Sequence, residues 1–331
     1  MDNLVSLSVV AVYSAMGVYT VAFLLFTLDL AKRSTEVPQR TQAPVGASVG
    51  ASAPAEALEQ TELSRTELPR ADSEGLGGAT RFQRAAFALT ILGWVLHFAA
   101  VVFRGIAAQR VPWVNLFEFG LVATAMGVGV FLLAQLWKDL RFLGAYITGF
   151  TVLSLGIVTV NYYVDVVPLP PALQSAWLVI HVLVASLATA FFALGAGLSV
   201  VQLLRYRREA RAVAGLRFLD TLPGSATLES LAYRINIVGF VLWTFTLIAG
   251  AIWAERSWGR YWGWDTKEVW TFIIWTLFAG YIHARATRGW RGDRSAWLAI
   301  VGFSAIIFNY TVVNTMFTGL HSYSGLVTTP S

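Results

Sequence analysis

The sequence contains no cysteine, few charged residues and only four histidines. The absence of cysteine excludes disulfide bonds, thiolate metal sites and covalent thioether chemistry on this chain, so any thiol involved in its function belongs to another molecule. Charged residues make up 13% of the chain, about half of the usual globular share. A soluble globular domain is therefore not expected, and a nitrogen-ligated metal site must draw on the four histidines.

Apolar residues dominate instead: they account for 56% of the chain, and its mean hydropathy is +0.61. About twenty consecutive apolar residues are enough to span a bilayer as a helix, and the sequence contains eight such runs. They predict an all-α polytopic integral membrane protein with about eight transmembrane helices. The predicted spans cover residues 5–30, 83–104, 115–137, 141–161, 173–204, 229–253, 268–287 and 295–317.

Composition divides the chain into three regions. The first apolar run is too long for a secretory signal and lacks a convincing small-residue cleavage site, which favours a retained N-terminal transmembrane anchor at residues 1–31. Residues 32–80 contain four prolines, many small residues and almost no aromatics, and this composition predicts a disordered cytoplasmic linker. Residues 81–325 form the predicted transmembrane core.

Arginine and lysine predict the orientation. They concentrate in alternate loops, and the positive-inside rule places those loops in the cytoplasm and both termini on the outer side. The same rule explains the net charge of +5 without a nucleic-acid partner. We expect a multi-pass protein of the plasma (cytoplasmic) membrane. The inner group comprises Lys32, Arg33, Arg81, Arg84, Lys138, Arg141 and the clusters 205–217 and 285–294; the outer group comprises Arg104, Arg110, Arg256, Arg260 and Lys267.

The most unusual stretch is 253–270, which holds five tryptophans, a tyrosine and six charged residues in eighteen positions. Isolated tryptophans commonly anchor helices at the membrane interface. Here they alternate with Gly259, Gly263 and an ordered set of charges. Indole faces can stack on a large flat ligand, and glycine permits close approach of the backbone to it. A porphyrin fits this pattern.

The run Trp258–Trp270 resembles the tryptophan-rich WWD signature of the heme-handling proteins of cytochrome c biogenesis. Over roughly residues 81–325 the chain resembles the CcsA/ResC family of the System II pathway, whose members are labelled CcsB in some bacteria. Thr266 stands where proline is expected, a mild change at a predicted helix N-terminus. Residues 112–118 match the family's Pro-x-x-Asn-x-x-Glu stretch, and residues 168–177 are also similar to the family.

The resemblance implies the membrane subunit of a System II cytochrome c synthase, or heme lyase, that acts together with the ResB membrane protein (CcsB in the two-protein naming). Such a protein takes heme b across the membrane as a transported substrate and presents it to the Cys-x-x-Cys-His motif of apocytochrome c for thioether attachment. A thiol-reducing thioredoxin-like pathway is the remaining implied partner. Attachment requires proximity and orientation, so no residue of this chain is assigned a catalytic role.

A lone histidine on an apolar helix is usually structural, although ionisable residues within a membrane are functional candidates. His181 and His321 fall at the outer ends of their spans and match the family's two external heme ligands. His283, near the inner end of its span, matches the transmembrane heme ligand. His97 lies about 20 Å above the inner face at 1.5 Å per residue. It is the candidate on this chain for a second ligand beside His283, but the two could share an iron only if a helix tilted or broke. The resemblance implies that the ResB partner can supply this ligand instead.

The remaining predicted heme contacts belong to the outer tryptophan platform. They are Trp258, Tyr261, Trp262, Trp264, Asp265 and Trp270. Asp265 and Glu268 are candidates for shaping the pocket, and nearby cations are available to pair with them.

Three other functions remain open. A heme exporter without attachment activity would use the same histidines but would need no thiol-bearing acceptor. A solute transporter usually places its polar features near the midplane of the membrane, whereas this chain concentrates them at the outer rim. A non-heme membrane scaffold would tolerate the loss of His181 and His321.

Overall fold

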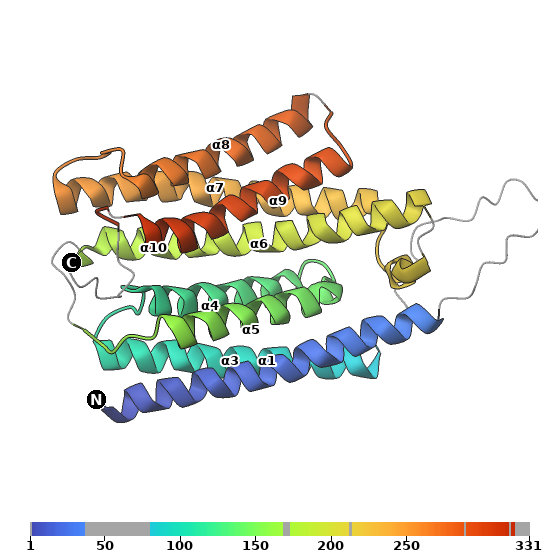
Figure 1. Ribbon diagram of the computed structural model, residues 1–331, viewed down its shortest axis with the longest axis horizontal. Helices are drawn as coiled ribbons and strands as arrows, with labels where there is room; N and C mark the ends of the chain where they lie inside the picture. Colours follow the sequence, from blue (N-terminus) through green and yellow to red (C-terminus); the bar gives the residue numbers. More distant parts are fainter. Residues whose placement is uncertain are drawn as a thin grey trace, which may run out of the picture.

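The computed structural model describes residues 2–36, 80–167, 173–211, 214–287, 289–317 and 319–321. All regular elements within these residues are helical, which confirms the predicted all-α class. In chain order they are α1 (Asp2–Glu36), α3 (Arg81–Ala108), α4 (Leu116–Ala134), η1 (Arg141–Leu143), α5 (Gly144–Asn161), α6 (Ala176–Arg211), η3 (Ala214–Thr221), α7 (Ser225–Trp258), α8 (Thr266–Thr287), α9 (Asp293–Phe308), η4 (Asn309–Val313) and α10 (Asn314–Met316). The long helices lie side by side and run in alternating directions (Figure 1).

Every predicted span is present as a helix. Seven of the helical segments in the described residues are long and apolar enough to cross a membrane. α8, which corresponds to the predicted span 268–287, is not among them, although it lies alongside α7 and α9 in the bundle (Figure 1). The reason is its composition, because α8 combines charged residues and His283 near its ends with two tryptophans and four threonines.

α1 continues to Glu36, past the predicted end of the anchor at residue 31. Its far end is bound to the start of α3. Asp29 pairs with Arg33 at 2.9 Å and accepts a hydrogen bond from the hydroxyl of Thr80. The Thr80 side chain also caps α3 by accepting from the amide of Gln83. Residues 37–79, the rest of the predicted linker, lie outside the described residues.

α6 joins the two halves of the bundle. One hydrophobic cluster contains residues of α1, α3, α4, α5, α6 and α7, and a second contains residues of α6, α7, α8 and α9. In the second cluster the ring of Phe192 from α6 stacks on Phe278 from α8. The most extensive helix pairings are α6 with α7 and α1 with α3. The bundle is therefore one packed unit rather than a row of independent hairpins.

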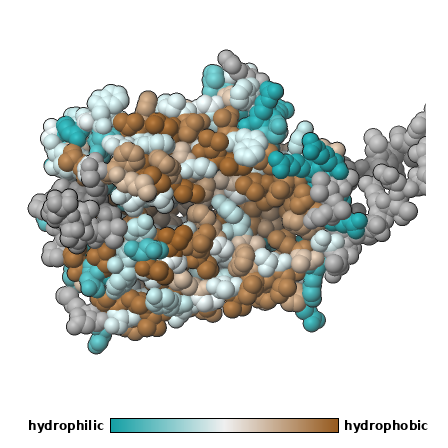
Figure 2. Space-filling view, in the orientation of Figure 1, coloured by the Kyte–Doolittle hydropathy of each residue, from teal (hydrophilic) through white to brown (hydrophobic). Residues whose placement is uncertain are grey.

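Hydrophobic side chains cover much of the middle of the molecule, and hydrophilic ones gather toward its ends (Figure 2). Because the helices alternate in direction, the start of α1 lies at the same end as the turns between α3 and α4 and between α7 and α8 (Figure 1). The turns between α4 and α5 and between α8 and α9 lie at the other end. The grouping of these turns agrees with the predicted topology, while the side of the membrane that each end faces stays a prediction.

Candidate functional site

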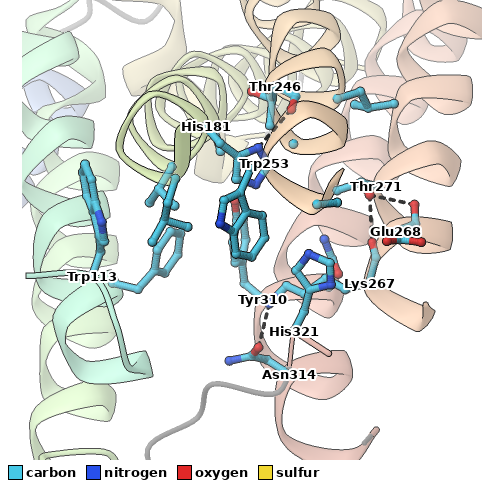
Figure 3. A pocket seen from close by; sticks show the side chains of 18 of the residues that line it. Trp113, His181, Thr246, Trp253, Lys267, Glu268, Thr271, Tyr310, Asn314 and His321 are labelled. Carbon is cyan, nitrogen blue, oxygen red and sulfur yellow. Dashed lines mark hydrogen bonds between the residues drawn. The ribbon is translucent and has the colours of Figure 1, made fainter. Parts of the chain in front are cut away.

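A cavity of about 150 Å³ lies near the end of the bundle that carries the tryptophan-rich turn (Figure 3). Its walls come from the start of α4 and from α6, α7, α8, η4 and the turn at 319–321. Most of the lining is apolar or aromatic. The polar side chains on its walls include Asn115, His181, Thr246, Lys267, Glu268, Thr271, Asn309, Asn314 and His321.

His181 projects from the first turns of α6 into this cavity. Its Nδ1 is 3.0 Å from the carbonyl oxygen of Thr246 on α7. A Cβ atom at Gly250 would lie 2.7 Å from the ring, so glycine is needed there to admit the imidazole. An Nδ1–H that donates to a carbonyl leaves Nε2 with a lone pair, which is the arrangement that metal-binding histidines use.

His321 reaches the same cavity from the turn after α10. Its Nδ1 is 2.6 Å from Oδ2 of Asp265, and this hydrogen bond to the imidazole holds the pKa of the Asp265 carboxyl below its usual value. Asp265 is thereby an orienting partner for the imidazole. A carboxylate on Nδ1 fixes the ring and makes Nε2 more basic toward a metal.

Trp253 lies between the two imidazoles (Figure 3). Its indole stacks on His181 with ring centres 5.8 Å apart and meets His321 edge-on at 5.4 Å. Trp258 contacts both Trp253 and His321, at 4.7 and 4.8 Å. Trp253 is only 2% exposed. The two predicted ligands are thus brought together, but an aromatic side chain occupies the space between them.

The other residues of the predicted platform divide into two groups. Tyr261 and Trp262 line the cavity. Trp264 is 76% exposed, and its backbone has a left-handed φ of 60°. Trp270 packs against Phe308 of α9 with ring centres 4.5 Å apart and is not part of the cavity wall. The tryptophan-rich stretch therefore supplies part of the cavity wall through Tyr261 and Trp262, while Trp264 and Trp270 lie outside the cavity.

Glu268 holds this stretch in shape. Its Oε2 accepts hydrogen bonds from the backbone amides of Gly263 at 2.8 Å and Asp265 at 3.1 Å. Arg260 lies 3.6 Å from its other oxygen. The turn begins where α7 ends at Gly259, whose φ of 69° suits glycine. This geometry gives Glu268 a structural role, in agreement with the pocket-shaping interpretation.

A second buried carboxylate organises the wall opposite α8. Glu118 is fully buried near the start of α4, where it pairs with Arg104 at 3.1 Å and Arg110 at 2.7 Å. Asn115 caps α4 by accepting from the Glu118 amide at 2.8 Å. These contacts fix the turn that places Trp113 on the cavity wall. Residues 112–118, which match a stretch of the family, therefore contribute to the wall of the cavity.

The two other histidines lie away from this cavity. His283 is on an exposed face of α8, toward the opposite end of the bundle. His97 is fully buried in α3, where its Nε2 is 2.9 Å from the carbonyl oxygen of Leu121. α3 and α8 lie on opposite sides of the bundle (Figure 1). The structure does not bring His97 and His283 together.

Sequence reasoning did not single out several of the cavity residues, among them Asn309, Tyr310 and Asn314. Asn309 and Tyr310 belong to η4, a π-helix that interrupts the last predicted span. Such insertions recur at functional sites because they redirect side chains. The available signal was the pair of asparagines in an otherwise apolar span, since polar groups there are costly unless they serve a purpose.

The described residues contain no group of three or more His, Asp or Glu side chains that could hold a free metal ion. Two axial imidazoles are sufficient when a macrocycle supplies the other ligands. The cavity volume is below the range of about 300–1,000 Å³ that is usual for ligand sites. A flat ligand bound between His181 and His321 would therefore have to displace Trp253.

A family model and individual similar proteins both relate this chain to cytochrome c assembly. Residues 113–321 match the family model described as Cytochrome C assembly protein. Cytochrome c biogenesis protein CcsA of Prochlorococcus marinus (strain MIT 9312) is 35% identical over 261 residues, covering 71% of this chain and 83% of that protein. The protein of the same name from Guillardia theta is 34% identical over 262 residues, covering 72% and 84%.

A solved structure, Cytochrome c Heme Lyase CcmF, superposes with a TM-score of 0.62 over 93% of this chain. Sequence identity is 16%, so the similarity is one of fold alone. The alignment covers 46% of the CcmF chain, so the present chain corresponds to about half of that protein.

Proposed function

The chain belongs to the CcsA family of cytochrome c assembly proteins and is a multi-pass membrane protein of cytochrome c biogenesis. From this membership we propose that it is the membrane subunit of a System II cytochrome c synthase. In this proposal it takes heme b across the plasma membrane, holds it at the outer face between His181 and His321, and presents it to apocytochrome c.

The observation that carries the proposal is the orientation of the two imidazoles. Both rings approach one aromatic cavity, and in both the Nδ1 atom is engaged by an oxygen of the protein. Each Nε2 is therefore the nitrogen left for iron. One hydrogen bond would also satisfy a structural histidine, so the proposal is supported by the fact that two such rings line the same aromatic cavity.

The chemistry of attachment is addition of each cysteine S–H across a heme vinyl group, which forms a C–S and a C–H bond. This chain supplies position, because bound heme and the acceptor motif meet at one face. The thiols belong to apocytochrome c, in keeping with a chain that lacks cysteine. Reduced thiols would come from a thioredoxin-like pathway.

The partner is the ResB membrane protein, which together with this chain would form the complete synthase. The position of His283 supports this assignment, because its side chain is exposed on the outside of the bundle. A second heme ligand for His283 would then come from ResB. His97, buried and hydrogen-bonded, has a structural role in this proposal.

The test is the visible absorption spectrum of the purified protein, with and without ResB, beside three variants. Wild type is expected to show a low-spin b-type spectrum. His181→Ala and His321→Ala are expected to lose heme or turn high-spin, whereas Arg256→Met, a control at an exposed position of α7, keeps the outer-site spectrum. Equal low-spin heme in all four proteins would contradict the external site. Attachment to apocytochrome c in a reconstituted assay then separates a synthase from an exporter.

A further inference from the structure

Lys267 is a cation on the wall of the cavity, in the first turn of α8 (Figure 3). Its Nζ donates a hydrogen bond to Oδ1 of Asn314 at 2.6 Å and lies 5.5 Å from the centre of the Tyr310 ring. An ammonium group has three N–H donors. A single neutral amide and one aromatic ring leave much of this capacity for a ligand.

The neighbouring carboxylates are engaged elsewhere. Asp265 is bound to His321, and Glu268 accepts two backbone amides and faces Arg260. Among the described residues, no carboxylate oxygen lies within the 4.0 Å of Lys267 that would make a salt bridge. Lys267 thus differs from Arg104 and Arg110, whose charges at the same end of the molecule are paired with Glu118.

A second polar group of the same cavity lacks a hydrogen-bond partner in the described part of the protein. Asn309, which is buried and lines the same cavity, has an amide Oδ1 without a hydrogen-bond partner among the described residues. A polar group without a partner is costly in a buried wall, unless the wall receives a polar part of a ligand.

We infer that Lys267 binds a carboxylate substituent of the ligand that enters this cavity. The inference rests on the function proposed above, under which the ligand is heme and the substituent is one of its two propionates. A carboxylate on an ammonium forms a strong, charge-assisted hydrogen bond. Lys267 would then fix the rotation of the macrocycle about the axis between the two histidines, and with it the direction in which the vinyl groups point.

The experiment compares hemin with hemin dimethyl ester, in which both propionates are esterified. Each is titrated into purified full-length protein at one detergent concentration, and the low-spin Soret band reports binding. Wild type is expected to prefer hemin by about tenfold to a hundredfold, the effect of one hydrogen bond between charged groups. Lys267→Met is expected to reduce this preference to near unity, and Lys267→Arg to retain most of it.

Arg256→Met is the matched control, because Arg256 is an exposed cation in the last turn of α7 beside the same loop. It should keep the wild-type preference, which also corrects for any difference in how the two compounds partition into detergent. The comparison in wild type does not depend on the folding of any variant.

The outcomes separate this inference from the proposed function. If wild type binds both compounds equally with a low-spin spectrum, the role of Lys267 is overturned and the heme site stands. If Lys267→Met keeps the full preference for hemin, the carboxylate is bound by another group and the inference fails. If wild type binds neither compound, with or without ResB, the heme site and the role of Lys267 fail together.

Discussion

Trp253 links His181 and His321, which are 140 positions apart in the sequence. With its indole between the imidazoles, the space between them is closed to a macrocycle. Under the proposed function, heme could therefore bind there only if this side chain moved. Such coupling would lower the apparent affinity by the free energy needed to move the indole.

The sequence indicated both histidines because ionisable residues stand out in apolar helices, and the family resemblance assigned them a role. It could not indicate their orienting partners in the same way. The acceptor for His181 is the backbone carbonyl of Thr246, and every residue has a carbonyl. Gly250 had no visible role either, because its function is to leave space for a ring from another helix.

Gly250→Ala should disturb the site through that lost space. The new Cβ would lie 2.7 and 2.8 Å from atoms of the His181 ring, so the imidazole must shift and its bond to Thr246 weakens. Overpacking of this kind costs roughly 1–3 kcal/mol. We expect a lower thermal midpoint and a high-spin heme spectrum. Gly127→Ala in α4 is the control, since nothing lies within 4 Å of its added Cβ; equal spectra for the two variants would contradict the packing argument.

At the scale of elements, apolar length predicted each long helix, because a bilayer demands internally hydrogen-bonded segments of about twenty residues. The helix ends were less predictable. α6 and α7 continue past the predicted apolar runs at their basic ends, because helical structure outside the bilayer is stabilised by packing and can be solvated by water. The asparagines of the last span mark it as unusual, but they do not indicate that its backbone forms the π-helix η4. Whether a helix widens into a π-turn depends on the packing and hydrogen-bond partners that neighbouring helices provide for residues such as Asn309 and Tyr310. Those partners are known only from the tertiary structure.

Glu118→Gln tests how the start of α4 is held. The substitution leaves the guanidinium groups of Arg104 and Arg110 buried without a counter-charge. Breaking a buried ion pair typically costs about 3–5 kcal/mol, so intrinsic tryptophan fluorescence should report a markedly lower unfolding temperature. The turn with Trp113 should also become more accessible to protease.

Asp139→Asn is the matched control for this change. Its partner Arg141 and Asp139 itself are both about one-third exposed, and surface pairs contribute about 0–1 kcal/mol. A loss of stability for Glu118→Gln no greater than that of the control would show that the buried triad does not hold the turn.

At the scale of the whole molecule, the cavity includes the start of α8, whereas His283 lies near the end of that helix. His97 belongs to α3, and α3 and α8 lie on opposite sides of the bundle (Figure 1). One chain therefore offers a complete pair of imidazoles at one end and a single exposed imidazole near the other. This asymmetry is what a protein would need if heme entered beside a partner at one face and was held by this chain alone at the other.

The orientation of the bundle decides whether the cavity faces the acceptor cytochrome. Because the chain has no cysteine, single substitutions can be labelled with a membrane-impermeant maleimide in intact cells without altering the background. Trp264→Cys, at a position 76% exposed beside the cavity, should be labelled from outside. Lys138→Cys, exposed in the turn after α4 at the opposite end, should be labelled only after permeabilisation. The reverse pattern would put the cavity in the cytoplasm, where no exported apocytochrome could reach it, and the proposed direction of heme transfer would be wrong.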